Sequence, residues 1–256
     1  MKNVVLEGKN VSKFFGSLKA LQHVDFQIFQ GEILGLIGPN GSGKTTFVNV
    51  ITNVYPLEGD GWIKFKNITI NGLPPFKTAR LGIARTYQVI KPFLNMTVGE
   101  NIAIGAIFGR EDTVRSMHDV EKEVERQIDF LDLGVTKDTP VESLNIVDRK
   151  RMDLAKALAA HPDLLIIDEV MAGLNSKDID QMVEMILKIN ALGISILCIE
   201  HVMKAIMKIS HRIMVFQNGE KITEGNPTEI VNDKNVITAY LGSKYRSKER
   251  KHESQG

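Results

Sequence analysis

The residues from Gly38 to Thr45 have the types and the spacing of a phosphate-binding loop. They read GPNGSGKT and fit the pattern G-x-x-x-x-G-K-[ST] at every fixed position. Glycines let the backbone curl its N–H groups around an anion, and the start of a following helix adds the positive end of its dipole. The predicted phosphate site consists of Gly38, Pro39, Asn40, Gly41, Ser42, Gly43, Lys44, Thr45 and Thr46.

Two side chains of this loop would act directly on a nucleotide. Lys44 would place a positive charge at the β- and γ-phosphates, and the Thr45 hydroxyl would be a ligand for Mg²⁺. The surrounding sequence agrees, because the apolar run of residues 33–37 indicates a strand before the loop. Apolar residues at helical spacing follow it, at Phe47, Val48, Val50, Ile51 and Val54. A glycine-rich turn without a ligand is therefore the weaker interpretation.

An acidic pair, Asp168 and Glu169, follows the apolar run of residues 164–167, which is typical of a buried strand. Taken alone, such a pair is most simply explained as a helix N-cap. Together with an intact phosphate loop, it matches the second half of a P-loop NTPase site, in which Asp168 holds Mg²⁺ and Glu169 polarises the attacking water as a general base. The predicted cofactors are ATP and Mg²⁺.

Three other side chains gain a candidate role only from this context. Gln88 ends a strand predicted over residues 81–87, and His201 follows one predicted over residues 194–199, where α/β proteins keep ligand groups. By themselves these would be a surface amide and a structural histidine. Phe15, beside Gly16, is a candidate to stack on an adenine face, and the alternative is a core phenylalanine.

The predicted elements place these residues in an α/β chain with two additions. Short β-type segments at residues 4–7, 11–15 and 24–29, broken by glycines, predict an antiparallel lobe before the loop, and residues 59–70 predict an edge hairpin. Residues 89–162 are mostly helical in pattern, with amphipathic or helix-forming stretches at 119–133 and 148–160. Strand and helix patterns then alternate, and a last short helix is predicted over residues 226–233.

The composition is that of an ordinary globular chain. It has 256 residues, 43% of them hydrophobic, and a formal net charge of +1, which gives no sign of a nucleic-acid-binding surface. No apolar run reaches the length of a membrane helix and the start lacks a signal-peptide core, so a cytosolic protein is expected. The one cysteine, Cys198, is predicted to be buried and inert.

Two charged segments are expected to be solvated. The run Arg149-Lys150-Arg151 is most simply an exposed helix face. The polar end from Ser243 to Gly256 is expected to be frayed, and a weak contact with anionic lipid is the alternative.

The order of these elements resembles the ATP-binding cassette subunits of ABC transporters over nearly the whole chain. The resemblance is strongest to the ATPases of branched-chain amino acid importers. It rests on GIARTYQ at residues 82–88, MTVGEN at residues 96–101 and AGLN at residues 172–175. It implies a P-loop NTPase fold with a RecA-like mixed-sheet core over residues 1–88 and 163–242 and an inserted helical subdomain over residues 89–162.

The resemblance also implies roles and partners. Phe15 would be the adenine-stacking aromatic, Gln88 the sensor of Mg²⁺ and water, Leu174 and Asn175 part of the D-loop, and His201 the switch at the γ-phosphate. A separate membrane permease would dock on the helical subdomain and the Gln88 loop, placing the chain at the cytoplasmic face of the membrane. A second ATPase subunit and, indirectly, a solute-binding protein complete the expected assembly.

One motif departs from the family. Its signature, ordinarily Leu-Ser-Gly-Gly-Gln, caps the γ-phosphate held by a partner cassette, but the residues from Leu144 to Asp148 read LNIVD. Asn145 still suits a helix N-cap, whereas Ile146 and Val147 are bulky where glycines normally approach phosphate, and Asp148 brings a negative charge. We therefore expect a heterodimer, in which the site on this chain is competent and the partner's site is damaged. A lesser departure is Val170, where the family has proline.

Two other functions stay open at this point. A regulatory cassette that binds ATP without driving transport would also fit the altered signature. A small-molecule P-loop kinase would need an acceptor site and lid arginines, which the sequence does not reveal.

Overall fold

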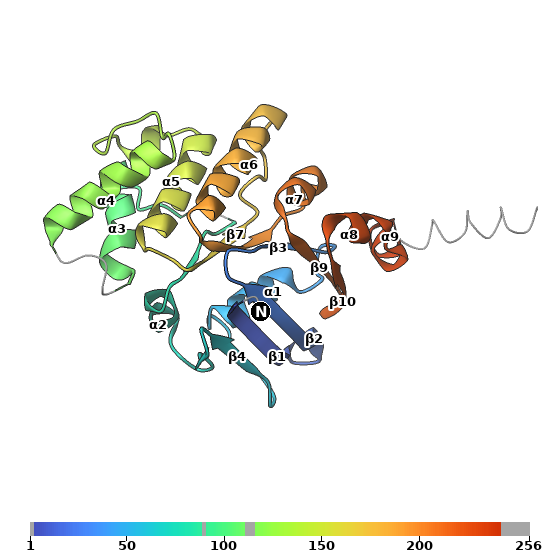
Figure 1. Ribbon diagram of the computed structural model, residues 1–256. Coiled ribbons are helices and arrows are strands. Elements are labelled where there is room, and N and C mark those ends of the chain that lie inside the picture. Colours follow the sequence, from blue (N-terminus) through green and yellow to red (C-terminus); the bar gives the residue numbers. More distant parts are fainter. Residues whose placement is uncertain (1–2, 89–90, 111–115, 242–256) are drawn as a thin grey trace, which may run out of the picture.

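The computed structural model describes residues 3–88, 91–110 and 116–241, except for the side chains of residues 240 and 241. Two sheets and a group of helices make up the molecule (Figure 1). The larger sheet has six strands in the order β10-β9-β3-β8-β7-β6, all parallel except β10. Its strands are β3 (Ile33–Ile37), β6 (Ile83–Arg85), β7 (Leu164–Asp168), β8 (Ser195–Ile199), β9 (Arg212–Gln217) and β10 (Glu220–Gly225).

The central strands are buried on both faces, as parallel strands in α/β proteins are. Alternate residues of β7 enter two different cores: Leu165 and Ile167 pack with the helical group, and Leu164 and Ile166 face the smaller sheet. Cys198 in β8 is fully buried, as predicted, and burial raises the pKa of its thiol well above the usual value.

The smaller sheet is antiparallel and has the order β2-β1-β4-β5. Its strands are β1 (Val4–Phe15), β2 (Leu18–Phe29), β4 (Trp62–Phe65) and β5 (Ile68–Thr69), so the predicted lobe and edge hairpin are confirmed. The expected break at Gly8 is wrong, because β1 continues through it with a register shift between Gly8 and Val11. A side chain at Gly8 would meet the Phe26 ring at 2.4 Å, so this glycine serves close packing.

Helix α1 (Lys44–Ile51) lies between the two sheets and continues directly from the phosphate loop. The Phe47 ring packs edge-on against Phe26 of β2, with ring centroids 4.8 Å apart, and against Phe216 of β9 at 5.2 Å. The helix ends at Ile51, so Val54 is not part of its buried face and is 46% exposed, contrary to the prediction. Phe47 therefore packs the helix that follows the loop against both sheets.

Helices α3 to α6 stand together on one side of the six-stranded sheet (Figure 1), whereas α1 packs in the other core, between the two sheets. Residues 91–110 and 116–162 are mostly helical, as predicted, and three of their helices have capped starts, at Thr97, Ser116 and Asn145. A further short helix follows the one expected to be last. The remaining helices are α2 (Pro75–Arg80), α3 (Val98–Phe108), α4 (Met117–Phe130), η1 (Val141–Ser143), α5 (Ile146–Ala159), α6 (Ser176–Ala191), α7 (Met203–Ile209), α8 (Pro227–Asn232) and α9 (Lys234–Leu241).

The run Arg149-Lys150-Arg151 at the start of α5 is not a solvated face. Lys150 is only 5% exposed and its ammonium group donates to two backbone carbonyls, while its two neighbours are half-buried. The prediction is wrong because the carbonyls come from residues 170 and 172, which local sequence cannot place beside the helix. The predicted polar tail, residues 243–256, lies outside the described residues.

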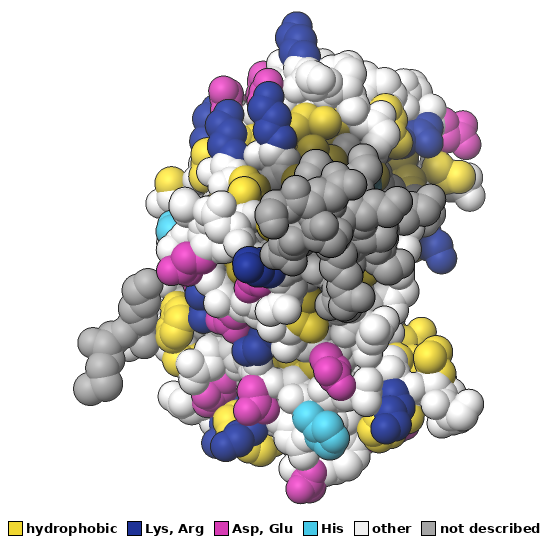
Figure 2. Space-filling view, turned by 90° about the vertical axis from the view of Figure 1, so that its right-hand side faces the viewer, with side chains coloured by type: hydrophobic (Ala, Val, Ile, Leu, Met, Phe, Trp, Pro, Cys, Tyr) yellow, Lys and Arg dark blue, Asp and Glu magenta, His cyan; other side chains and the backbone are white. Residues whose placement is uncertain are grey.

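Surface charge is mixed, as the small net charge predicts. On the face shown in Figure 2, both cationic and anionic side chains are present, with several of the cationic ones together at the upper left. Among the helices of the described residues, none combines the length and the apolar character that crossing a membrane requires.

Candidate functional site

The phosphate loop joins the end of β3 to the start of α1, and two of its glycines are dictated by close backbone contacts. A side-chain carbon at Gly38 would lie 2.4 Å from the Phe216 carbonyl oxygen, and one at Gly43 would lie 2.6 Å from that of Ala20. Gly43 also has φ of 104°, which favours glycine. The loop is thus enclosed by β9 on one side and β2 on the other.

Lys44 is buried and turns back over its own loop. Its Nζ donates to the carbonyl oxygens of Gly38 at 2.8 Å and Pro39 at 3.1 Å. Burial lowers the pKa of Lys44, and the charges of Glu169 and Asp168 oppose that shift. The acidic end of β7 and the phosphate loop therefore lie within electrostatic range of one another, as the two-part motif predicts.

A pocket of about 780 Å³ opens over the loop. It brings together predicted residues from distant parts of the chain, namely Phe15, Asn40, Gly41, Ser42, Gly43, Lys44, Thr45, Thr46, Gln88, Glu169 and His201. Gly38, Pro39 and Asp168 do not line it, and the first two serve through the carbonyls that receive Lys44. Four lining residues were not predicted: Leu18, Lys19, Ala20 and Asn218.

Asn218 reaches the pocket because the β9–β10 turn rests on the phosphate loop. The N–H of Gly219 donates to the Ser42 carbonyl oxygen at 3.0 Å, and the Gly219 carbonyl accepts from the Gln22 N–H at 2.8 Å. Asn218 and Gly219 are a residue pair typical of a tight hairpin turn, but only tertiary pairing places that turn beside the loop.

Phe15 stands at one end of the pocket and is 43% exposed, so it is not a core phenylalanine. Its ring makes an edge contact with Tyr55, with centroids 5.3 Å apart, and the Lys13 ammonium lies 5.4 Å from its centroid. These contacts fix one side of the ring. An exposed aromatic face held in this way is suited to stacking on a planar base.

The side chains of Gln88 and His201 both approach one carboxylate oxygen of Glu169. The Gln88 Nε2 donates to Glu169 Oε2 at 2.7 Å, and the His201 Nδ1 lies 3.7 Å from the same oxygen. Glu169 follows β7 directly, has φ of 50° and donates its N–H to the Ile199 carbonyl at the end of β8. A left-handed backbone at a non-glycine residue is strained, and such strain is concentrated at functional sites.

Asp168, just before it, is held by an arginine that the sequence did not reveal as a site residue. The Arg85 Nη2 lies 2.8 Å from Asp168 Oδ2, both side chains are buried, and Arg85 also donates to Asn49 in α1 at 2.6 Å. The signal available was position: Arg85 ends β6 beside β7, at the same edge as the acidic pair. Arg85 thereby connects the acidic strand end to the helix that carries the loop.

Another carboxylate, that of Glu200, is close enough to Glu169 to interact with its charge and is 1% exposed. Burial raises its pKa to about 7, and the charge of Glu169 adds to the shift, while the Met171 N–H and Lys150 oppose it. Its Oε1 accepts from Met171 N at 2.8 Å, and its Oε2 has no partner among the described residues.

We expect Glu200→Gln to alter the pH dependence of stability. Because the folded pKa of about 7 exceeds the ordinary 4.5, the parent loses roughly 3 kcal/mol of unfolding free energy as the pH rises from 4.5 through 7. Glutamine keeps the acceptor for Met171 and has no such loss. In urea unfolding from pH 5 to 8, the free energy of unfolding of Glu200→Gln should rise relative to that of the parent as the pH increases. Glu220→Gln, at an exposed carboxylate, should show no such relative rise. A difference that stays constant with pH would contradict this.

The altered signature forms the start of α5. Asn145 caps the helix, as predicted, by accepting the Asp148 N–H at 2.9 Å, and its own amide nitrogen donates to the Asp148 carboxylate at 2.7 Å. Ile146, at the first position of the helix, is 54% exposed. The surface presented at this helix start is therefore apolar and anionic, unlike one that receives phosphate.

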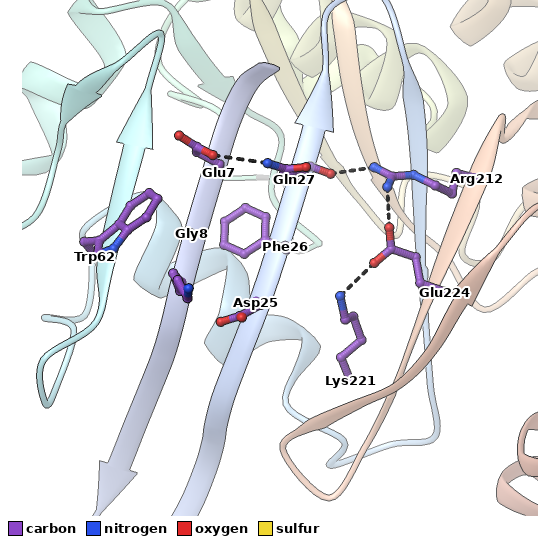
Figure 3. Close-up of a pocket in the computed structure, with 10 residues that line it drawn as sticks. Glu7, Gly8, Asp25, Phe26, Gln27, Trp62, Arg212, Lys221 and Glu224 are labelled. Carbon is purple, nitrogen blue, oxygen red and sulfur yellow. Dashed lines mark hydrogen bonds and ion pairs between the residues drawn. The ribbon is translucent and has the colours of Figure 1, made fainter. Parts of the chain in front are cut away.

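A second pocket, of about 380 Å³, lies away from this site between β1, β2 and the β9–β10 hairpin (Figure 3). Four of its charged groups are bound to neighbouring side chains or backbone. Arg212 donates to Glu224 and to the Gln27 carbonyl, Lys221 pairs with Glu224 at 2.8 Å, and Gln27 donates to Glu7 at 3.2 Å. These bonds connect the hairpin to the small sheet, and Lys9 and Asp25 also line the pocket.

The fold and the site together define an ATP-binding cassette. Among solved structures, the chain is similar to an ATP-binding cassette from an ABC transporter in its ADP conformation, with a TM-score of 0.82 and 30% identity over 93% of this chain and 99% of that one. A nucleotide-free cassette gives the same TM-score at 29% identity. The predicted fold class is confirmed.

Sequence comparison shows to which group of ATP-binding cassettes the chain belongs. Residues 21–172 match the family model described as ABC transporter, and residues 220–246 match one described as branched-chain amino acid ATP-binding cassette transporter. The chain is 34% identical to the probable branched-chain amino acid transport ATP-binding protein LivG of Archaeoglobus fulgidus, covering 93% of this chain and 96% of the relative. It is also 34% identical to the high-affinity LivG protein of Escherichia coli, covering 94% and 99%. The chain therefore belongs to the ATPase subunits of ABC transporters, in the branched-chain amino acid family.

Proposed function

We propose that this chain binds Mg-ATP in the 780 Å³ pocket and hydrolyses it with Glu169 as the general base. The observation that carries the proposal is the convergence of Gln88 and His201 on one oxygen of Glu169, at the edge of the pocket that the phosphate loop lines. Gln88 and His201 would orient the carboxylate and the attacking water. Lys44 and the loop N–H groups would hold the β- and γ-phosphates, and Phe15 would stack on the adenine.

The residues present suit Mg²⁺, which prefers oxygen ligands and usually shares them with phosphate and water. The Thr45 hydroxyl and the Gln88 amide oxygen would hold it directly, and the Asp168 carboxylate, which does not line the pocket, would hold it through water. Among residues 3–88, 91–110 and 116–241, no group of three or more His, Cys, Asp or Glu side chains forms a cage by itself, which agrees with a metal bound jointly with nucleotide. When bound, Mg²⁺ supplies charge neutralisation at the phosphate oxygens.

The energy released would drive a separate membrane permease for amino acids of the branched-chain type, as the names of the relatives suggest. Exposed apolar side chains flank Gln88, where such a permease would dock on the helical subdomain, residues 89–162. They are Tyr87, Phe93 and Leu94, which are 54%, 53% and 49% exposed. The chain would then work at the cytoplasmic face of the membrane, with residues 1–88 and 163–242 as the ATP-binding core.

The partner cassette is a different chain in this proposal. In the family's head-to-tail arrangement, the start of α5 would face the nucleotide of the partner. Ile146 and the Asp148 carboxylate are poorly suited to cap a γ-phosphate there. Two charges 4 Å apart at an effective dielectric of 20 repel by about 4 kcal/mol, and half of that lowers affinity more than tenfold. A heterodimer would have one nucleotide site capped by an intact signature, that of the partner. A homodimer would have none, because both signatures would be altered.

The test is reconstitution of this chain with a second cassette and a permease in liposomes. We expect phosphate release to rise at least about threefold when a solute-binding protein loaded with a branched-chain amino acid is added, and no rise with the unloaded protein. The matched control is the same assembly with Lys44→Ala, which should neither hold nucleotide nor respond. Equal rates with loaded and unloaded binding protein would contradict the transport function.

A regulatory cassette with little turnover is the second candidate, and the altered start of α5 favours it. It predicts firm ATP binding by the parent and no stimulation of hydrolysis by any permease in the same assay.

A further inference from the structure

Helix α5 contacts both segments that carry the groups meeting at the hydrolytic site. Lys150, on its second turn, donates from Nζ to the Val170 carbonyl at 2.6 Å and to the Ala172 carbonyl at 2.8 Å. Val170 follows Glu169 directly. A buried ammonium group is thus bound to the backbone of the segment that begins with Glu169, and no nucleotide contact accounts for its burial, because Lys150 does not line the 780 Å³ pocket.

The same short segment is held from the other side by Glu200, at the end of β8. The Glu200 Oε1 accepts the N–H of Met171, which lies between the two residues that Lys150 contacts. The backbone of Val170, Met171 and Ala172 is therefore held by two buried side chains of opposite charge. The charge of Glu200 raises the pKa of Lys150, and the charge of Lys150 lowers the pKa of Glu200. The left-handed backbone of Glu169 needs such support, since a residue of this type relaxes to another conformation unless its surroundings determine it.

One turn further along α5, Asp153 holds the Gln88 segment. Its Oδ2 accepts from the N–H of Tyr87 at 3.4 Å, and its Oδ1 is bound by Lys156 at 2.8 Å. Lys150, Asp153, Gln88 and Glu169 line one small cavity of about 10 Å³. The helix therefore sets the relative position of Gln88 and Glu169, whose side chains meet at 2.7 Å.

We propose that Lys150 is a positioning residue for ATP hydrolysis, which acts by holding the carbonyls of Val170 and Ala172 and so fixes Glu169 against Gln88. This inference rests on the proposed function, because it assigns Lys150 to the reaction in which Glu169 is the base. It has a further consequence, since Asn145, in the altered signature, is the N-cap of α5. A contact made by the start of this helix with a partner's nucleotide is passed to Glu169 through Lys150, over little more than one helical turn.

The test compares kcat and KM for ATP in the reconstituted pair. Lys150→Met removes the donors but keeps the length and the apolar stem. We expect kcat to fall between about tenfold and a hundredfold, as for a misplaced catalytic group, while KM changes less than about twofold. Lys150→Arg, which can still donate to both carbonyls, should restore kcat to within about threefold of the parent. In a Glu169→Gln background, Lys150→Met should cost nothing further.

Arg151→Met is the matched control, because Arg151 also donates to a backbone carbonyl, that of Asp132, and to Gln181, away from the site. It should leave kcat unchanged. If Lys150→Met fails to fold, Glu200→Leu removes the opposite contact and should show the same loss of kcat at constant KM. A joint loss of kcat and affinity, or failure of Lys150→Arg to rescue, overturns the inference while parent turnover still stands. Parent turnover that does not depend on Glu169 overturns the proposed function instead.

Discussion

Glu169→Gln is expected to lower turnover by at least about 100-fold without weakening ATP binding. Glutamine keeps the shape of glutamate and can still bond Gln88, but it cannot take a proton from water, and a positioned general base is worth about 10² to 10⁴ in rate. In the proposed heterodimer the change should remove almost all phosphate release, because the proposal assigns the competent site to this chain. The measurement is phosphate release by the reconstituted pair, alongside nucleotide binding by the isolated chain.

The matched variant is the equivalent change in the partner, which should leave most of the turnover in place. If the partner's change abolishes hydrolysis and Glu169→Gln does not, the two sites have been assigned in reverse. A second control repairs the signature with Asn145→Ser, Ile146→Gly, Val147→Gly and Asp148→Gln together. Relief of the charge and the bulk at the start of α5 should let this variant hydrolyse ATP as a homodimer at least about tenfold faster than the parent.

Arg85→Met is expected to reduce the free energy of unfolding by about 3 to 5 kcal/mol. It leaves the Asp168 carboxylate, which is 3% exposed, without the guanidinium that compensates its charge. It also removes the bond from Arg85 to Asn49 that connects β6 to α1. The measurement is urea unfolding of the chain without nucleotide at neutral pH.

Removing both charges together tests the cause. The double variant Arg85→Met with Asp168→Leu should recover part of the loss, since apolar replacement of a whole buried pair costs less than removal of one partner. Arg80→Met, at an exposed arginine near the same strand, should change stability by less than about 0.5 kcal/mol. If Arg85→Met is no more destabilising than Arg80→Met, the ion pair does not carry the stability assigned to it.

The residues that could be predicted from sequence are those whose role follows from a local pattern. The phosphate loop needs particular types at fixed spacing, and Asp168 and Glu169 end a strand whose apolar run is continuous. Phe15, Gln88 and His201 were weak alone and depended on the family resemblance. The structure places them at one pocket, which is the arrangement the resemblance implies.

The residues that could not be predicted act through contacts with distant parts of the chain. Arg85 is a basic residue at a strand end until β7 is placed beside it, and Lys150 is one cation in a run of three until residues 170–172 lie against α5. Nothing in their own neighbourhoods distinguishes them from solvated charges. Burial of a charge is decided by the partner it finds, and here the partners are backbone carbonyls and a carboxylate far along the chain.

The β9–β10 turn determines when, during synthesis, the nucleotide-binding site can be complete. The loop residues leave the ribosome early, but Phe216, against which Gly38 is packed, and Gly219, which bonds Ser42, belong to the last fifth of the chain. Strands β8 and β9, which flank β3 in the sheet, also emerge late. A nascent chain must therefore be synthesised past Gly219 before nucleotide can assist its folding.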